Sequence, residues 1–495
     1  MRRRSFSCHL QDYCFGGSFA AGLDNVGLEA QPGDDPWTPC TPLARPSIKL
    51  EAAAEDGGSF AAEYAALRKR GGRTDGAATQ GACEPKPLPP LKHEASSTGA
   101  SVANITKSLL GIGMLTLPHA LADGTPAVGV GMLLLCGSLS AFSFFMLGYC
   151  AHLTGAATLP QLWDATVGAG SAALVEAMIV LDTMLSCVAF TLLIGDYMSK
   201  SVAGLLPGLP AALRSRSALV MLIGLGLLLP LCMVRRLSLL RFSSIAGLFC
   251  TLYVFLYVVC DFAWFSVVDD GELAPAAAPS LQLRPGGLLR CTAIFSVAFM
   301  SHCNAPSFYA DLQDRSPSRF AFVSGVAFGT AFLVYAAFGL SGLGRFGSEV
   351  PGNALSAYPL STPVLLMWLG MAFCVTASFP LVFGALWGSV LRLAGRACGR
   401  PLDQGGAWNR VAAGAVVLAI SVAGAVLKDL SVVVSLCGAL SGTALSLVFP
   451  GLIMLNMKRR KTAHFVALAR GLVAVGTVLA LCSTSAVLGK AVLGE

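Results

Sequence analysis

The chain has 495 residues, of which 55% are hydrophobic and only 12% are charged. Soluble domains carry about 25% charged residues, so this composition excludes an ordinary soluble protein and favours a chain with many membrane spans. The net charge of +7 does not indicate nucleic-acid binding, because the basic residues are scattered and form no run interleaved with aromatic side chains. We therefore expect the lipid bilayer, and no nucleic acid, as a partner.

Residues 1–98 are polar and rich in Gly, Pro, Ser and Ala, with no sustained periodicity. Such a segment buries too little apolar surface to offset its ordering entropy, so it is predicted to be a disordered tail, except that 51–71 has the composition of a short surface helix. Met1–Arg4 is followed by no apolar core, which argues against a cleavable signal peptide. Residues 99–495 form the predicted transmembrane domain.

Eleven stretches are long and apolar enough to cross about 30 Å of hydrocarbon, which takes about 20 residues. The predicted fold class is therefore an all-α multi-pass membrane protein. The predicted spans are 101–121, 126–151, 173–198, 217–234, 243–266, 290–312, 320–344, 361–391, 408–427, 430–456 and 463–488.

Lys and Arg collect on the cytosolic side of membrane proteins. With a cytosolic tail, the loops on the same side carry 13 basic residues and the opposite loops carry 8. The tail adds 11 more, and the acidic run 269–272 lies on the opposite side. These counts predict a cytosolic N-terminus. None of the sixteen cysteines forms a C-x-x-C pair, so we expect no metal site and no disulfide framework.

Two of the spans are interrupted. Ser101–Ala120 is cut by the sequence Gly-Ile-Gly at 111–113, and Cys291–Gln313 is cut by 301–304 and by Pro306. A helix broken inside a bilayer survives only where its backbone is buried in protein or lines a cavity. Broken spans at corresponding positions of two halves point to the substrate site of an inverted-repeat transporter.

A break exposes free N–H groups at one helix end and free carbonyls at the other, which attract a carboxylate and a cation respectively. Gly111 and Gly113 let a ligand approach the backbone, although a Gly-x-Gly sequence also serves close helix packing. Asn104 lies about two turns before Gly111 on the same helix side, where its side-chain carbonyl suits a cation. In the sixth span, Asn304 suits a helix cap and Pro306 the first turn of the restarted helix.

Two titratable groups inside spans are candidates for a proton relay, His302 and Asp182. The alternative for His302 is a hydrogen bond to a neighbouring carbonyl. Asp182 instead has the alternatives of a structural pair, with Lys107 as one partner, or a polar gate contact. In the eighth span, Thr376 and Ser378 precede Pro380, where hydroxyls either cap a kink or bind an ion.

These residues resemble the amino acid/auxin permease family, which includes sodium-coupled neutral and vacuolar or lysosomal amino acid transporters. The first span resembles the family's N-x-x-K-x-x-x-G-x-G-x-L-x-L-P-x-A opening, as NITKSLLGIGMLTLPHAL. The sixth is similar to its F-x-x-H-x-N followed by Y-x-E-L, with Asp311 in place of Glu. Further similarities follow in order at Tyr335 with 339–347, at 352–355 (GNAL) and at 435–439 (SLCGA).

The resemblance covers residues 101 to about 488 and implies a leucine-transporter-type fold. In that fold, spans 1–5 and 6–10 are inverted repeats, helices 1 and 6 are discontinuous, and the eleventh helix packs outside. In the sodium-coupled branch an Asn of span 1 and a Thr of span 8 hold the ion; Asn104 and Ser378 match them, with Ser in place of Thr. Proton-coupled relatives also carry that Asn, so the coupling ion stays open between H⁺ and Na⁺.

We therefore expect a secondary transporter that moves amino acids by alternating access, coupled to a cation, in the plasma membrane or a vacuolar or lysosomal membrane. The alternative is an amino acid sensor with weak transport, whose tail signals to a cytosolic partner. No ATP-binding loop or catalytic triad is present, so we expect neither an enzyme nor a cofactor. The expected ion ligands are Asn104, Thr376 and Ser378. The expected substrate-binding residues are Gly111, Ile112, Gly113, Met114, Phe299, Ser301, His302 and Asn304.

Overall fold

The computed structural model describes residues 95–233, 240–268, 285–399, 402, 406–458 and 463–493. These residues are helical, and the one β pairing recorded among them is an isolated bridge between Ser96 and Leu312. The predicted tail, with the suggested helix at 51–71, lies outside the described residues except for 95–98. Over those four residues Ser96 joins the bridge and the first helix begins at Thr98.

Ten helices of the described part are long and apolar enough to span a membrane, and a pair bent by 48° makes an eleventh segment. This confirms the eleven predicted spans. In chain order they are α2 (Thr98–Leu109) with η2 (Ile112–Thr116) and α3 (Leu117–Asp123); α4 (Pro126–Thr154); α6 (Ala172–Leu205); α8 (Arg216–Ile223) with η4 (Gly224–Leu228) and α9 (Leu229–Met233); α10 (Leu240–Val268); α11 (Pro285–Ala298) with η7 (His302–Asn304) and α12 (Ala305–Asp311); α13 (Pro317–Phe346); α14 (Thr362–Ala397); α15 (Ala407–Val426); α16 (Leu430–Cys437) with η10 (Gly438–Gly442), η11 (Ala444–Val448) and α17 (Phe449–Asn456); and α18 (Ala463–Leu493).

The spans are joined by short helices that the sequence analysis did not predict. They are α5 (Leu159–Thr166), η3 (Ala169–Ser171), α7 (Ala211–Arg214), η8 (Gly347–Glu349) and η9 (Ala354–Ala357). The start of α5 follows the usual rules, because the Thr158 hydroxyl accepts from the Gln161 amide and Pro160 lies in the first turn. The fourth and tenth spans contain π-helical turns at η4, η10 and η11, which the hydropathy pattern did not reveal.

Each broken span is the first of a set of five. Because five is odd, the second set enters from the opposite end of the helix array, so the two sets are inverted. This is the leucine-transporter-type arrangement predicted from the sequence. We call the end where α2 begins the tail end. The opposite end is the lid end, and the lid is the loop 347–361 between α13 and α14.

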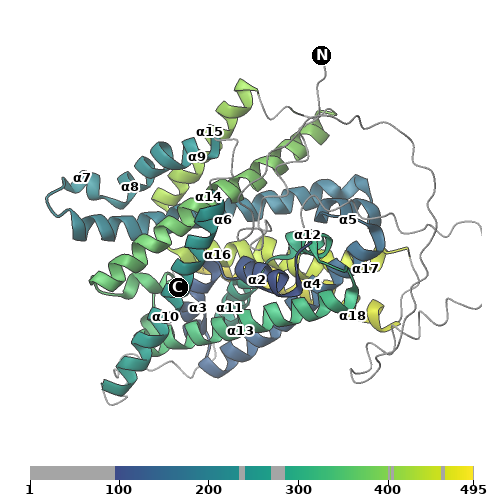
Figure 1. The fold of residues 1–495 in the computed structure, drawn as a ribbon, viewed down its shortest axis with the longest axis horizontal. Helices are drawn as coiled ribbons and strands as arrows, with labels where there is room; N and C mark the ends of the chain where they lie inside the picture. Colours follow the sequence, from purple (N-terminus) through teal and green to yellow (C-terminus); the bar gives the residue numbers. More distant parts are fainter. Residues whose placement is uncertain are drawn as a thin grey trace, which may run out of the picture. The chain divides into compact units, whose positions relative to one another are not determined.

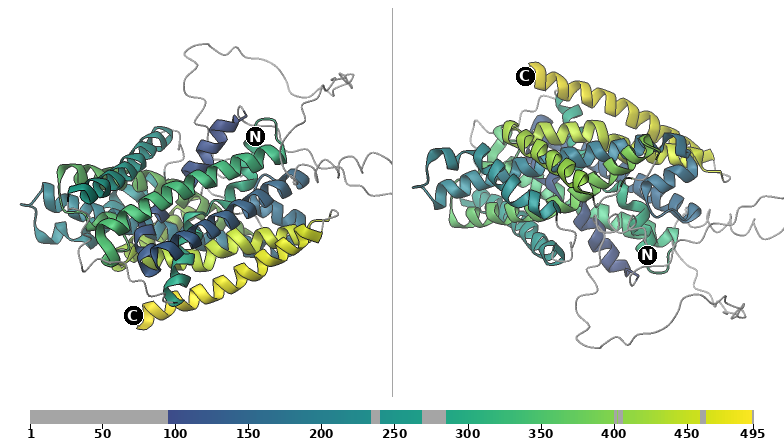
Figure 2. Two further views of the ribbon diagram at one scale, coloured as in Figure 1. Left: turned by 90° about the horizontal axis from the view of Figure 1, so that it is seen from below. Right: turned by 90° about the horizontal axis from the view of Figure 1, so that it is seen from above.

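Two groups of the described helices pack closely within themselves. The bundle consists of α2–α3, α4, α11–α12 and α13, and the scaffold consists of α6, α8, α14 and α15. Glycines allow close approach within each group: a Cβ on Gly148 of α4 would meet the Phe320 ring of α13, and one on Gly424 of α15 would meet Thr191 of α6. The eleventh helix, α18, packs on α11 and α17, and it lies at the edge of the array in both views of Figure 2. Figure 1 shows the chain order of the helices.

Candidate functional site

The break in the first span lies at Leu110 and Gly111. The helix α2 ends at Leu109, Gly111 is extended (φ −120°, ψ −156°), and the chain restarts as a 3₁₀ turn at Ile112. The Gly111 amide donates to the Leu109 carbonyl at 2.7 Å, and the Met114 amide donates to the Gly111 carbonyl at 3.2 Å. The first amides of the restarted turn have no acceptor in a preceding turn, so this break can offer N–H groups to an anion.

The break in the sixth span runs from Phe299 to Ser301. Here α11 ends at Ala298, η7 begins at His302, and α12 restarts at Ala305 with Pro306 in its first turn. This confirms the predicted place of Pro306. Asn304 occupies the residue before α12, but its side chain makes no capping hydrogen bond. Asn304 therefore occupies the predicted cap position without a capping bond from its side chain, and that side chain has no hydrogen bond recorded among the described residues.

Tyr335 of α13 joins the two breaks. Its hydroxyl lies within hydrogen-bond distance of the Ala298 carbonyl, at 2.7 Å, and of the Leu109 carbonyl, and its one hydrogen is shared between these last carbonyls of α11 and α2. A second tie is the hydrogen bond of 2.6 Å between the Ser108 and Ser301 hydroxyls. Ser108 already donates to the Ile105 carbonyl at 2.9 Å, so Ser301 is the donor between the two hydroxyls. The two breaks thus form one site.

The eight expected substrate residues differ in exposure. Gly111 is exposed, and Ile112 and Asn304 are half-buried. Gly113 packs tightly, because a Cβ there would lie 2.9 Å from the Ala298 Cα atom. Phe299 is also fully buried and lies edge-on to Tyr335, with ring centroids 5.2 Å apart. The five buried members of the set are Gly113, Met114, Phe299, Ser301 and His302.

His302 is fully buried between the broken span and α4. Its Nε2 atom lies 3.1 Å from the Ser140 carbonyl and 2.9 Å from the Ser143 hydroxyl. Because a carbonyl only accepts, Nε2 carries the hydrogen, and Nδ1 is the unprotonated nitrogen. Nδ1 has no hydrogen-bond partner among the described residues. The ring is held as a neutral imidazole by α4, which is the structural alternative considered for it.

Asp182 lies in α6 and is 9% exposed. Its Oδ1 atom is 3.1 Å from the Ser441 hydroxyl and 3.3 Å from the Cys437 thiol, both at the π-helical part of the tenth span. Lys107 is not among its ion-pair or hydrogen-bond partners in the described part of the chain. Cys437 also lines a small cavity beside the first break, together with Ile112 and Val297.

The three expected ion ligands lie on α2 and α14. Asn104 is half-buried, with no side-chain hydrogen bond recorded among the described residues, and Ser378 donates to the Cys374 carbonyl at 2.9 Å. Lys107, one turn from Asn104, interacts electrostatically with Cys374. Asn104 lies about one turn from Lys107, and Ser378 lies about one turn from Cys374, in both cases toward the tail end. Asn104 and Ser378 are therefore at similar depth. Pro380 has no amide hydrogen, so the Thr376 carbonyl loses its helical donor and can serve as an oxygen ligand.

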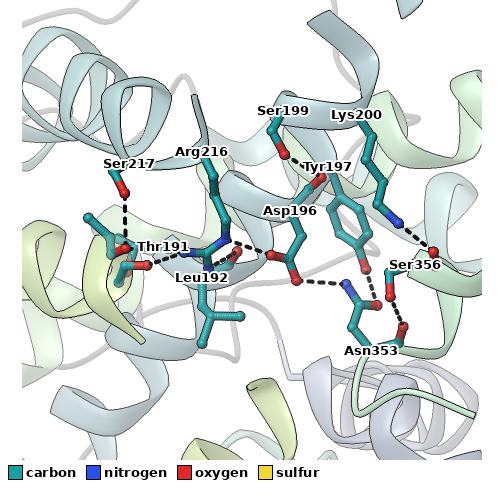
Figure 3. Close-up of polar contacts among 12 residues, drawn as sticks. Thr191, Leu192, Asp196, Tyr197, Ser199, Lys200, Arg216, Ser217, Asn353 and Ser356 are labelled. Carbon is teal, nitrogen blue, oxygen red and sulfur yellow. Dashed lines mark hydrogen bonds and ion pairs between the residues drawn. The ribbon is translucent and has the colours of Figure 1, made fainter. Parts of the chain in front are cut away.

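The lid is held to the scaffold by the polar network in Figure 3. Asp196 of α6 accepts from Arg216 Nε at 2.8 Å and from Asn353 Nδ2 at 3.3 Å, and Tyr197 donates to Asn353 Oδ1 at 3.0 Å. Lys200 donates to the Ser356 carbonyl of the lid. The lid is therefore bound to the end of α6, and Asp196 of α6 binds Arg216 at the start of α8 as well.

The lid also contacts the bundle. His119 of α3 donates from Nδ1 to the Val350 carbonyl at 2.9 Å. Beside it, Arg290 of α11 makes two hydrogen bonds to Asp123 of α3, at 2.9 and 3.2 Å. At the tail end α2 has different neighbours: its ends are tied to bundle residues, and it leans away from the other helices in both views of Figure 2. The lid end is therefore closed across both groups.

Sequence reasoning missed Tyr335, Ser108, Ser441 and Cys437 as residues of this site. Tyr335 belongs to the family-like run that follows the sixth span, which was the available signal for it. Ser108 lies one turn after Asn104, on the side of α2 that was already predicted to face the break. Cys437 lies in the family-like run 435–439, which was the available signal for it, whereas Ser441 had none, because small residues in a membrane helix usually indicate packing alone.

The sequence profile of the family described as "Transmembrane amino acid transporter protein" matches residues 94–488. The chain belongs to this family. The match covers the whole membrane part, including both breaks, the lid and the eleventh helix. It confirms the resemblance on which the sequence prediction relied.

Curated relatives agree with the family. Human solute carrier family 38 member 8 is 28% identical over 392 residues, covering 75% of this chain and 87% of the relative. Sodium-coupled neutral amino acid transporter 7 of Xenopus laevis is 24% identical, covering 73% of this chain and 81% of the relative. Vacuolar amino acid transporter 7 of Saccharomyces cerevisiae is 27% identical over 302 residues, with 59% and 58% covered.

A solved structure is similar in fold. The crystal structure of an Eremococcus coleocola manganese transporter, in complex with an aromatic bis-isothiourea substituted compound, matches with a TM-score of 0.50 and 14% sequence identity. The match covers 79% of this chain and 87% of the other. At this identity the likeness concerns the arrangement of helices alone, and the chemistry of the site comes from this chain's own residues.

Proposed function

We propose that this protein is a secondary transporter that moves amino acids by alternating access, coupled to a cation. The observation that carries the proposal is the joined pair of breaks, where the ends of α2 and α11 meet at Tyr335. Restarting turns offer N–H groups to a carboxylate, and ending helices offer carbonyls to an ammonium group. A zwitterionic amino acid carries both groups. Family membership supports the same substrate class.

The cation is H⁺ or Na⁺. A sodium ion would be bound by the Asn104 side-chain oxygen, the Ser378 hydroxyl and the Thr376 carbonyl, all oxygen donors of the kind hard cations prefer. The relative named as sodium-coupled supports this ion, and a proton is the alternative. Asn104→Ala and Ser378→Ala are each expected to raise the cation concentration for half-maximal transport more than they change substrate binding at saturating cation.

Alternating access is supported by the difference between the two ends. The lid bridges bundle and scaffold at the lid end, while Gly111 is exposed and α2 leans outward at the tail end. We infer from this combination a state that admits substrate from the tail side. We place the tail side in the cytosol, following the basic residues of its loops. The membrane is the plasma membrane or a vacuolar or lysosomal membrane.

The test is flux of radiolabelled amino acids into proteoliposomes, over a substrate panel with imposed Na⁺ and pH gradients. Accumulation against a gradient, driven by one of the two ions, is the expected result. Saturable binding without stoichiometric flux would overturn the proposal and favour a sensor. Uptake that depends on neither Na⁺ nor pH would contradict the proposed cation site.

A further inference from the structure

Five carboxylates on the described helices have arginine partners, whereas Asp182 of α6 has no basic partner among the described residues. Glu176 and Asp182 are the two buried carboxylates of α6, and they differ in their partners. Glu176 is fully buried, and Arg392 Nε lies 2.7 Å from its Oε1. Asp182 is almost as buried, with a hydroxyl and a thiol as its neighbours. The paired carboxylates are Asp123 with Arg290, Asp164 with Arg396, Glu176 with Arg392, Asp196 with Arg216 and Asp261 with Arg345.

An ionised carboxylate without a counter-ion costs several kcal/mol when it is buried. Asp182 therefore needs a positive partner from outside the described chain or has to be neutral part of the time. A proton neutralises the carboxylate and occupies less space than a metal ion. This matters because the cavity beside Cys437 is small. A buried carboxylate inside a membrane protein that lacks a structural partner is typical of an ion pathway.

The neighbours of Asp182 can satisfy both of its protonation states. When it is ionised, it accepts from the Ser441 hydroxyl and the Cys437 thiol. When it is protonated, it donates to the Ser441 oxygen, and Ser441 directs its own hydrogen to the Cys437 carbonyl, 2.8 Å away. Rotation of one hydroxyl thus switches the cluster, and no buried hydrogen is left without an acceptor.

His302 has no such arrangement. A second proton would sit on Nδ1, which has no hydrogen-bond partner among the described residues, on a ring whose centroid lies 5.8 Å from that of Phe144 and 6.4 Å from that of Phe328. Protonation there would bury a charge and an unpaired donor together. Of the two proton-relay candidates, the contacts therefore favour Asp182.

The position of Asp182 couples it to the breaks. Its two neighbours lie at the junction of α16 and the π-helical turn η10, and Cys437 lines the cavity that Ile112 of the first break also lines. A π-helical turn has one residue more per turn than the α-helix around it and is a common place for a functional shift. The cavity therefore connects the first break to Cys437, whose carbonyl accepts the hydrogen bond of Ser441.

We propose that Asp182 is the residue that carries the transported proton. In each cycle the carboxylate takes one proton from water on one side of the membrane and becomes a neutral acid while the amino acid is bound. It releases that proton on the other side after the helices have rearranged. This rests on the proposed transport function and adds to it the identity of the coupling ion and of its carrier.

The groups that titrate or carry charge around Asp182 are few. The titratable side chains nearest to it are the thiols of Cys187, Cys303 and Cys437, from α6, η7 and the tenth span. The Glu176–Arg392 pair lies six residues, or about 9 Å, closer to the tail end of α6. From α14 and α15 the described chain brings no ion-pair partner to Asp182.

The experiment uses the full chain in proteoliposomes with an entrapped pH indicator and a transported amino acid. In the parent protein, adding the amino acid outside should acidify the lumen. Asp182→Asn removes the titrating group while keeping size and a hydrogen-bonding amide. It should abolish the amino acid-evoked acidification and lower pH-driven accumulation at least about tenfold, while exchange of labelled for unlabelled amino acid continues. Asp164→Asn, at a half-exposed ion pair, is the matched control and should leave the acidification unchanged.

The outcomes separate the two proposals. A parent protein without amino acid flux refutes the transport function itself. A parent that transports without acidification, or an Asp182→Asn variant that still acidifies at the parent rate, refutes Asp182 as the carrier and leaves transport standing. If Asp182→Asn also loses amino acid exchange, the pH dependence of transport by the Ser441→Ala variant tests the role of Asp182 instead. A shift of its pH–rate profile by about half a pH unit or more supports the switch, and an unchanged profile overturns it.

Discussion

The two breaks occupy equivalent positions of the inverted repeats but have different surroundings. In the first, Gly111 is exposed and an added Cβ would find no atom closer than the Leu109 carbonyl oxygen at 3.8 Å. In the second, Phe299 and His302 are fully buried, and His302 is hydrogen-bonded to α4. The first break is therefore the one that can present its backbone to a ligand. The second break forms the rigid side of the site, against which the ligand is positioned.

This difference shows that repeat symmetry specifies where the helices break and not what each break does. The first break begins with the exposed Gly111 and the half-buried Ile112, which can move without disrupting a core, although Gly113 after them is packed on Ala298. The second is fixed by aromatic rings of the bundle, with His302 edge-on to Phe144 at 5.8 Å. The following variants test this division of roles, beginning with the largest expected effect.

Gly113→Val should have the largest effect. The new side chain would overlap the Ala298 backbone, whose Cα lies 2.9 Å from the Cβ position. Overpacking of this kind costs about 1–3 kcal/mol, so both thermal stability in detergent and transport should fall, transport at least about tenfold. Gly111→Ala is the comparison: it should keep stability, because the site has room, and lower transport through substrate binding. Equal stability losses in the two variants would contradict the division.

Tyr335→Phe should have the next largest effect, because it removes the hydroxyl that bonds both Leu109 and Ala298 carbonyls. Leaving buried acceptors unpaired costs about 1–3 kcal/mol, which thermal unfolding of the purified protein would report. Tyr253→Phe is the control, since that hydroxyl bonds the Pro363 carbonyl at an exposed place. The joined-site interpretation fails if the two variants lose the same stability.

The tie between Ser108 and Ser301 should be worth less. A double-mutant cycle of Ser108→Ala and Ser301→Ala is expected to give a coupling energy of about 1 kcal/mol in unfolding free energy. Ser301→Ala alone should also raise KM, because the hydroxyl positions the second break against the first. A coupling energy of zero would mean that the two breaks are held together by Tyr335 and packing alone.

His302→Gln should have the smallest effect. Gln retains a donor for the Ser140 carbonyl, and His302 makes no other polar contact than those to Ser140 and Ser143 among the described residues. Transport should stay within about threefold of the parent, and its pH dependence should not change. A flattened pH profile would show that His302 titrates during transport and would sharpen the search for a second proton site.

The sequence by itself determined the eleven spans, the places of both breaks and Pro306 as the restart of the second. Each of these follows from local physics: about 20 apolar residues are needed per span, and glycine and proline interrupt a helix wherever they occur. The family resemblance added the order of spans and the residues expected at the site. Hydropathy could not locate α5, η10 or η11, because short interfacial helices and π-turns do not alter the apolar period enough to be seen.

Only the tertiary structure decided which residues meet. Tyr335 lies 226 residues after Leu109, and Ser441 lies 259 residues after Asp182, so their contacts depend on how the repeats pack. The same packing turned Gly113 into a contact with α11 while leaving Gly111 free, although both looked alike in the sequence. It also gave His302 carbonyl and hydroxyl partners and left Asp182 without a basic one. A side chain's charge state and accessibility are set by its neighbours, and the neighbours of these residues come from distant parts of the chain.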